Sequence, residues 1–149
     1  MKILIVEDCK VWAALITAAL ENHGTQTHTA ETMRDAVAFL ADHAPDCVLL
    51  DLNLPDSRAT DTVRRLTAHY DGPLVIVTGE EEQPQHPYVL SKNYSAKPEI
   101  IRASVNAAIQ ENQTRAMIRR LHPRAMFSKT LEKGTKLMAA GFATAGAPA

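Results

Sequence analysis

Acidic, hydroxyl and amino side chains stand at or near the ends of apolar runs in this sequence: Glu7, Asp8, Asp51, Thr78 and Lys97. Three carboxylates in one cleft repel each other and raise their own pKa values unless a cation neutralises them. Gathered together, they would therefore predict a hard divalent ion such as Mg²⁺. An aspartate beside such an ion can attack phosphorus and form an acyl phosphate, while an ammonium and a hydroxyl bind the phosphoryl oxygens. This chemistry requires that the five residues converge.

Short apolar runs supply the elements that would bring them together. Three runs, 2–6, 47–50 and 74–77, are continuous and typical of strands buried on both faces of a parallel sheet. A weaker run at 25–29 and a short segment around Tyr94 complete five expected strands. Helical segments alternate with them, which predicts an α/β fold with a doubly wound parallel sheet. Such sheets carry their chemistry at the carboxyl ends of the strands.

The expected helices differ in quality. Residues 11–21 place Val11, Leu15, Ala18 and Ala19 on one stripe, Thr32 opens a second helix, and 60–70 form a third. Pro98 begins a long helix that turns Ile101, Val105 and Ala108 inward. Pro84 and Pro87 interrupt the segment from Glu80 to Ser91. We therefore expect the fourth helix of the fold, in that segment, to be shortened or irregular.

Size and composition suit one small domain. The chain has 149 residues, 46% of them hydrophobic and 22% charged, with a net charge of −1. We expect a cytoplasmic protein, because no signal peptide or bilayer-spanning run is found and the spacing of Cys9 and Cys47 suits free thiols. The common nucleotide-binding and hydrolase motifs are missing, and the six histidines lack metal-ligand spacing.

Four motifs arrive together in the order and approximate spacing of a known family. They are Ile3-Leu4-Ile5-Val6-Glu7-Asp8, Val48-Leu49-Leu50-Asp51-Leu52-Asn53-Leu54-Pro55-Asp56, Val75-Ile76-Val77-Thr78-Gly79 and Lys97-Pro98. Over residues 1–121 the chain resembles a response-regulator receiver domain of two-component signalling, with a flavodoxin-like, chemotaxis-regulator-like fold. The resemblance implies a phosphoprotein that takes a phosphoryl group from a histidine kinase or a histidine phosphotransfer protein and signals by protein contact.

The resemblance also implies a role for each matching residue. Asp51 would be the phosphoacceptor, Lys97 would bind the phosphoryl group, and Thr78 would be the switch hydroxyl. Tyr94 would be the switch aromatic. The Mg²⁺ ligands would be Glu7, Asp8, Asp51 and the backbone carbonyl of Asn53. Ala59 departs from the pattern, because the family usually has glycine there, and this predicts a reshaped turn.

Simpler interpretations stay open for single residues. Asp8 could cap a helix, Lys97 could be a solvated lysine, and Tyr94 could be a packing residue. Two other functions also stay open: a degenerate receiver that binds a partner regardless of phosphate, and a Mg²⁺-dependent phosphatase. Because Asn53 stands where such phosphatases usually have a second acid, we expect no enzyme activity beyond the chemistry of Asp51 itself.

The C-terminal part of the chain is basic. Between Arg115 and Lys136 there are seven basic residues and one acid, a net charge of +6, which leaves −7 for the rest. We expect residues 122–149 to form a partly helical or disordered extension, rich in alanine and glycine at its end, that is able to contact an acidic partner. No DNA-binding helix-turn-helix domain is recognisable there.

Overall fold

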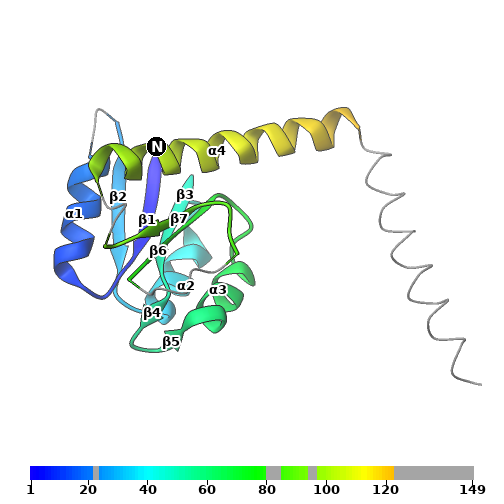
Figure 1. Cartoon of the computed structure of the whole chain (residues 1–149). Coiled ribbons are helices and arrows are strands. Elements are labelled where there is room, and N and C mark those ends of the chain that lie inside the picture. The colour runs from blue at the N-terminus through cyan, green and yellow to red at the C-terminus, as the bar shows by residue number, and fades with distance from the viewer. Residues whose placement is uncertain (22–23, 80–84, 94–96, 123–149) are drawn as a thin grey trace, which may run out of the picture. The chain divides into compact units, whose positions relative to one another are not determined.

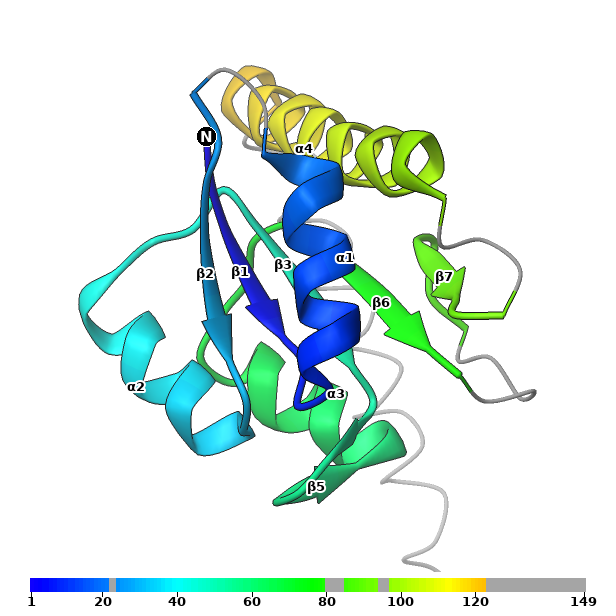
Figure 2. The ribbon, with the colours of Figure 1, turned by 90° about the vertical axis from the view of Figure 1, so that its left-hand side faces the viewer.

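The fold is a five-stranded parallel sheet between two layers of helices, seen in a computed structural model that describes residues 1–21, 24–79, 85–93 and 97–122 (Figures 1 and 2). The strands are β1 (Lys2–Val6), β2 (Gln26–Ala30), β3 (Cys47–Asp51), β6 (Leu74–Thr78) and β7 (Val89–Ser91), in the order β2-β1-β3-β6-β7. The sequence-based prediction of a doubly wound parallel sheet is confirmed. The order reverses direction between β1 and β3, where such sheets place their functional groups.

Two apolar cores lie on the two faces of the sheet. The helices α1 (Lys10–Leu20) and α4 (Pro98–Leu121) pack on one face through residues that include Ile16, Ile101 and Val105. The helices α2 (Met33–Asp42) and α3 (Ala59–Thr67) pack on the other face through Met33 and Leu66. β1, β3 and β6 have fully buried apolar residues on both faces, as their continuous apolar runs predicted.

A side-chain cap marks the start of α2, and the predicted stripe of the first helix was right only at Ala19. Thr32 caps α2, since its hydroxyl accepts a hydrogen bond from the Asp35 N–H at 3.0 Å. In α1, Val11, Leu15 and Ala18 are exposed, whereas Ala19 is buried. The large buried residues of the helix are Ile16 and Leu20. Periodicity alone did not distinguish these neighbouring faces, because α1 is apolar on more than one side.

The loop after β3 forms a small hairpin of β4 (Asn53–Leu54) and β5 (Ser57–Arg58). Ala59, which follows it, has a φ of 49° and adopts the left-handed conformation that favours glycine. Its N–H donates to the carbonyl of Leu52 at 2.9 Å, which closes the hairpin loop. The turn is therefore built around an alanine where the family usually has glycine.

The connection between β6 and β7 has no helix in its described residues, 79 and 85–88. Residues 80–84 lie outside the description, so the predicted shortened or irregular helix is not seen in the part that can be described. The fourth helix along the described chain, α4, is instead long, with 24 residues. The last strand also differs from expectation: β7 ends at Ser91, and Tyr94 lies outside the described residues.

The chain divides into two compact units, residues 1–112 and 113–149. α4 runs through the boundary between them as one continuous helix. The part of the second unit that the structure describes is the end of this helix, where Met117, Ile118 and Leu121 are exposed. The predicted boundary after Leu121 stays a prediction, because the described residues end at 122. No described helix is long and apolar enough to cross a membrane.

Candidate functional site

Three acidic side chains meet at the carboxyl end of the sheet. Glu7 and Asp8 follow β1, and Asp51 is the last residue of the neighbouring strand β3. One carboxylate oxygen from each lies within 4.8 Å of the other two. Glu7 is 1% exposed and Asp51 5% exposed, whereas Asp8 lies at the surface. The parallel pairing of β1 with β3 brings Asp51 to Glu7 and Asp8, although it lies more than forty positions after them in the chain.

A lysine joins the two buried acids. Lys92 directly follows β7, and its Nζ lies 2.7 Å from Glu7 Oε2 and 2.8 Å from Asp51 Oδ2. Its side chain is only 11% exposed. The second oxygen of each carboxylate accepts a backbone N–H two residues further on, from Cys9 to Glu7 Oε1 and from Asn53 to Asp51 Oδ1, both at 3.1 Å. Both carboxylates are thus held between a lysine and the backbone.

The pKa values follow from this burial and pairing. Burial raises the pKa of Glu7 above its usual 4.5, and the charge of Asp51 adds to the rise, while the close pairing with the Lys92 ammonium opposes it. Burial alone would lower the pKa of Lys92, but the two carboxylates raise it above its usual 10.5. Lys92 is therefore charged at neutral pH, and the Glu7 carboxylate takes up a proton more readily than an exposed glutamate does.

The remaining predicted residues are placed as follows. Thr78 ends β6 and is fully buried, and its carbonyl accepts the N–H of Lys92 at 2.8 Å. Asn53 begins β4, next to Asp51 in the loop. Lys97 is exposed, and its carbonyl accepts hydrogen bonds from Ile100 and Ile101 at the start of α4. Tyr94 is outside the described residues, so its role as a switch aromatic stays a prediction.

The expectation for Lys97 needs a correction, because the lysine in contact with Asp51 is Lys92. β7 pairs with β6 in the register Thr78 to Ser91, which puts the next residue, Lys92, over the acids. Lys97 lies five residues further, at the beginning of a helix. The signal that the sequence analysis missed is the pair Val89-Leu90 directly before Ser91-Lys92, a short apolar run that ends in a polar residue like the other strands. The Lys97-Pro98 bond is trans.

The site suits a divalent cation. Its donors are carboxylate oxygens, the ligands that Mg²⁺ prefers. Glu7 Oε2 is buried and, despite its contact with Lys92, makes no hydrogen bond in a favourable geometry. A buried oxygen without a well-formed partner carries a desolvation cost that a metal ligand bond would offset. Glu7, Asp8 and Asp51 therefore fit a metal ion.

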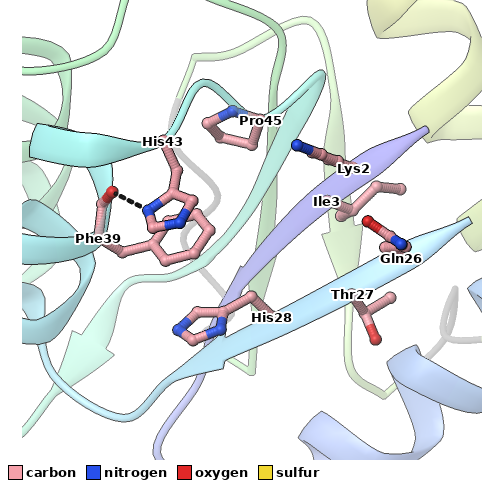
Figure 3. Close-up of a pocket in the computed structure, with 8 residues that line it drawn as sticks. All are labelled: Lys2, Ile3, Gln26, Thr27, His28, Phe39, His43 and Pro45. Carbon is pink, nitrogen blue, oxygen red and sulfur yellow. Dashed lines mark hydrogen bonds between the residues drawn. The ribbon is translucent and has the colours of Figure 1, made fainter.

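The opposite end of the sheet has a different character. There a hollow of about 280 Å³ is lined by Lys2, Ile3, Gln26, Thr27, His28, Phe39, His43 and Pro45 (Figure 3). Phe39 stacks between His28 and His43, with ring centroids 4.1 and 4.3 Å apart. No carboxylate is among its lining residues, so this hollow lacks the acids of the site described above.

Comparison with known proteins identifies the family. The profile of the response regulator receiver domain matches residues 3–96, more than half of the chain. The chain belongs to this family. The matched range includes all three acids, Thr78 and Lys92, and ends before Lys97.

Two curated relatives agree with this assignment, and one solved structure shares the fold. Protein PilH of Pseudomonas aeruginosa is 31% identical over 117 residues, which cover 72% of this chain and 97% of PilH. The virulence transcriptional regulatory protein PhoP of Salmonella typhimurium is 30% identical over 119 residues, which cover 75% of this chain and 53% of PhoP. The chain thus spans about half the length of that relative. A CheY-like receiver domain from Methylobacillus flagellatus shares the fold, with a TM-score of 0.62, 24% identity, and coverage of 72% of this chain and 98% of that one. The chain therefore contains a receiver domain of the kind found in two-component signalling.

Proposed function

We propose that this receiver is a phosphoacceptor switch in which Asp51 takes a phosphoryl group from a phosphohistidine, on a histidine kinase or on a histidine phosphotransfer protein. The observation that supports this most directly is the contact of Asp51 with Lys92 inside a cluster of three carboxylates. A carboxylate is the nucleophile, and a fixed ammonium is available for the charge of the transferred group.

In the transfer, an oxygen of Asp51 attacks phosphorus and forms a P–O bond. The P–N bond of the phosphohistidine breaks, and its electron pair stays on the imidazole nitrogen of the partner. Mg²⁺ bound by Glu7, Asp8 and Asp51 would supply positive charge for the phosphoryl oxygens. Lys92 would move its ion pair from the Asp51 carboxylate to the phosphoryl group. Thr78, at the end of the adjacent strand, is the hydroxyl that we expect to bind another phosphoryl oxygen.

Output would pass through protein contact. The described end of α4 exposes Met117, Ile118 and Leu121 together with Arg119 and Arg120, and the sequence continues basic up to Lys136. We propose that this segment contacts an acidic downstream protein. The two cysteines are free thiols, which suits a reducing cytoplasm, and we propose that location. The protein would act on no external substrate, because its chemistry is that of its own Asp51.

The test is phosphorylation by a small acyl phosphate with Mg²⁺, followed by intact mass. We expect the wild type to gain the mass of one phosphoryl group, and Asp51→Asn to gain none. Beryllofluoride, a phosphoryl mimic, should bind the wild type and not the variant. If the wild type gains no mass from either a small donor or a phosphorylated histidine protein, the proposal fails, and a scaffold that binds its partner regardless of phosphate becomes the better account.

A further inference from the structure

The ammonium of Lys92 has a third neighbour besides the two acids. Trp12, in the first turn of α1, places its ring centroid 5.6 Å from Lys92 Nζ. This distance lies within the range of a cation–π interaction, in which the negative face of an aromatic ring attracts a cation. Trp12 is half-buried, and the ammonium beside it is largely shielded from water. Partial desolvation strengthens such a contact.

The three neighbours of the ammonium differ in one respect. Glu7 and Asp51 are the same carboxylates that fit a metal ion, and Asp51 is the proposed phosphoacceptor. A divalent ion on these oxygens would compete with Lys92 and repel it. The indole ring neither binds the metal ion nor accepts the phosphoryl group, because it carries no oxygen ligand and no charge. Its attraction for the ammonium stays when the carboxylates are taken up.

We propose that Trp12 is a positioning residue for Asp51 phosphorylation, whose indole face keeps the Lys92 ammonium in the pocket while a metal ion and a phosphoryl group occupy the carboxylates. The inference rests on the proposed function and adds to it a residue from α1. It predicts that the electron density of the ring, and not only its bulk, sets how fast Asp51 reacts.

The decisive test uses the fact that the chain has a single tryptophan. Replacing it with mono-, di- and trifluorinated tryptophan lowers the negative potential of the ring face stepwise with little change in volume. The rate of Asp51 phosphorylation by a small acyl phosphate with Mg²⁺ is then followed by intact mass. We expect the rate to fall with each added fluorine, by about threefold to tenfold over the series. Equal rates across the series would overturn the inference.

Two substitutions separate the ring from its bulk. Trp12→Phe keeps an aromatic face and should lose less of the phosphorylation rate than Trp12→Leu, which keeps an apolar side chain without one. Circular dichroism checks that both variants fold. If the two variants react equally slowly, Trp12 acts only by packing, and the positioning role is wrong.

A measurement without metal or phosphate distinguishes this inference from the proposed function. Trp12 emission is compared between the wild type and Lys92→Met in metal-free buffer, with Lys97→Met as the matched control. We expect Lys92→Met to change the emission and Lys97→Met to leave it unchanged. The wild type could gain no phosphate while the emission of Lys92→Met still differs from that of the wild type. This result would refute the phosphoacceptor proposal and leave only the contact between Trp12 and Lys92. Emission that is insensitive to Lys92 would refute the positioning role even if Asp51 is phosphorylated.

Discussion

At the carboxyl end of the sheet two buried carboxylates and a lysine lie in contact, whereas at the amino end three aromatic rings are stacked beside a surface hollow. The first arrangement keeps charged groups away from water, and their desolvation destabilises the folded state. The second needs little desolvation, because His28 and His43 are exposed. The buried charges thus lie at the carboxyl end, where we propose the chemistry, and the amino end holds a ring stack at the surface.

The largest expected effect comes from removing the ammonium at the carboxyl end. Lys92→Met would leave two buried carboxylates close together without their counter-ion. We expect phosphorylation of Asp51 to slow by about a hundredfold or more, since a fixed charge on the phosphoryl oxygens is lost. The metal-free protein should also lose roughly 3 kcal/mol of unfolding free energy at neutral pH. Intact mass and urea denaturation measure the two effects. Lys97→Met is the matched control, and a slow Lys97→Met beside a normal Lys92→Met would reverse our assignment of the lysine.

Asp56, a further carboxylate at the same end of the sheet, stabilises the fold. Asp56 accepts hydrogen bonds from the N–H groups of Met33 at 2.8 Å and Arg34 at 3.0 Å, at the start of α2. Although burial raises its pKa, these bonds and Arg65 bring it below the usual 3.8. Because the pKa of Asp56 is lower in the folded protein than in the unfolded chain, its charge stabilises the fold above pH 3.8. This stability is lost as the pH falls through the pKa of the folded state.

Asp56→Ala should therefore cost about 1 to 2 kcal/mol at pH 7. The cost should shrink as the pH falls below 3.8. Urea denaturation at pH 7 and at a pH below 3.8 measures this loss of unfolding free energy. Asp61→Ala, which removes an exposed acid in the first turn of α3, is the control. An equal cost at both pH values would show that the charge of Asp56 does not matter.

Glu7 is predicted to behave in the opposite way. Burial raises its pKa, so the folded protein binds the proton more tightly than the unfolded chain. The Glu7 carboxylate then lowers the free energy of unfolding at neutral pH. This loss is relieved as the pH falls through the raised pKa of the folded state towards 4.5. Glu7→Gln should raise the unfolding free energy at pH 7 by on the order of 1 kcal/mol and flatten its acid-side pH dependence. The same variant should bind Mg²⁺ more weakly. A less stable Glu7→Gln would mean that its pair with Lys92 outweighs the cost of burial.

The smallest effect is expected at the amino end. His43→Ala removes one ring of the stack and the hydrogen-bond contact of its Nδ1 with the carbonyl of Phe39. We expect a loss of about 0.5 to 1 kcal/mol in thermal or urea denaturation. Phosphorylation of Asp51 should not change. A phosphorylation defect in this variant would show that the two ends of the sheet are coupled. It would contradict our expectation that the ring stack has no influence on Asp51.

Much of the fold was predictable because its signals are local. Continuous apolar runs identified β1, β3 and β6, and the hydroxyl of Thr32 marked the start of α2. The buried side of α1 was not predictable in the same way, because Val11 and Ile16 are equally apolar and the choice between them depends on the face that meets the sheet. β7 was misplaced for a related reason: three residues are too short for a periodic signal.

The sequence by itself determined which kinds of group end the strands, and therefore that acids, a hydroxyl and an amine gather at one end of the sheet. It also determined the family, because motifs at strand ends are local and keep their order. Only the tertiary structure decided which lysine meets the acids. That choice depends on where β7 stops against β6, and the register Thr78 to Ser91 is a pairing between distant segments that no local pattern encodes. Trp12 came to light in the same way, because its partner Lys92 lies eighty residues away along the chain and reaches it only through the packed fold.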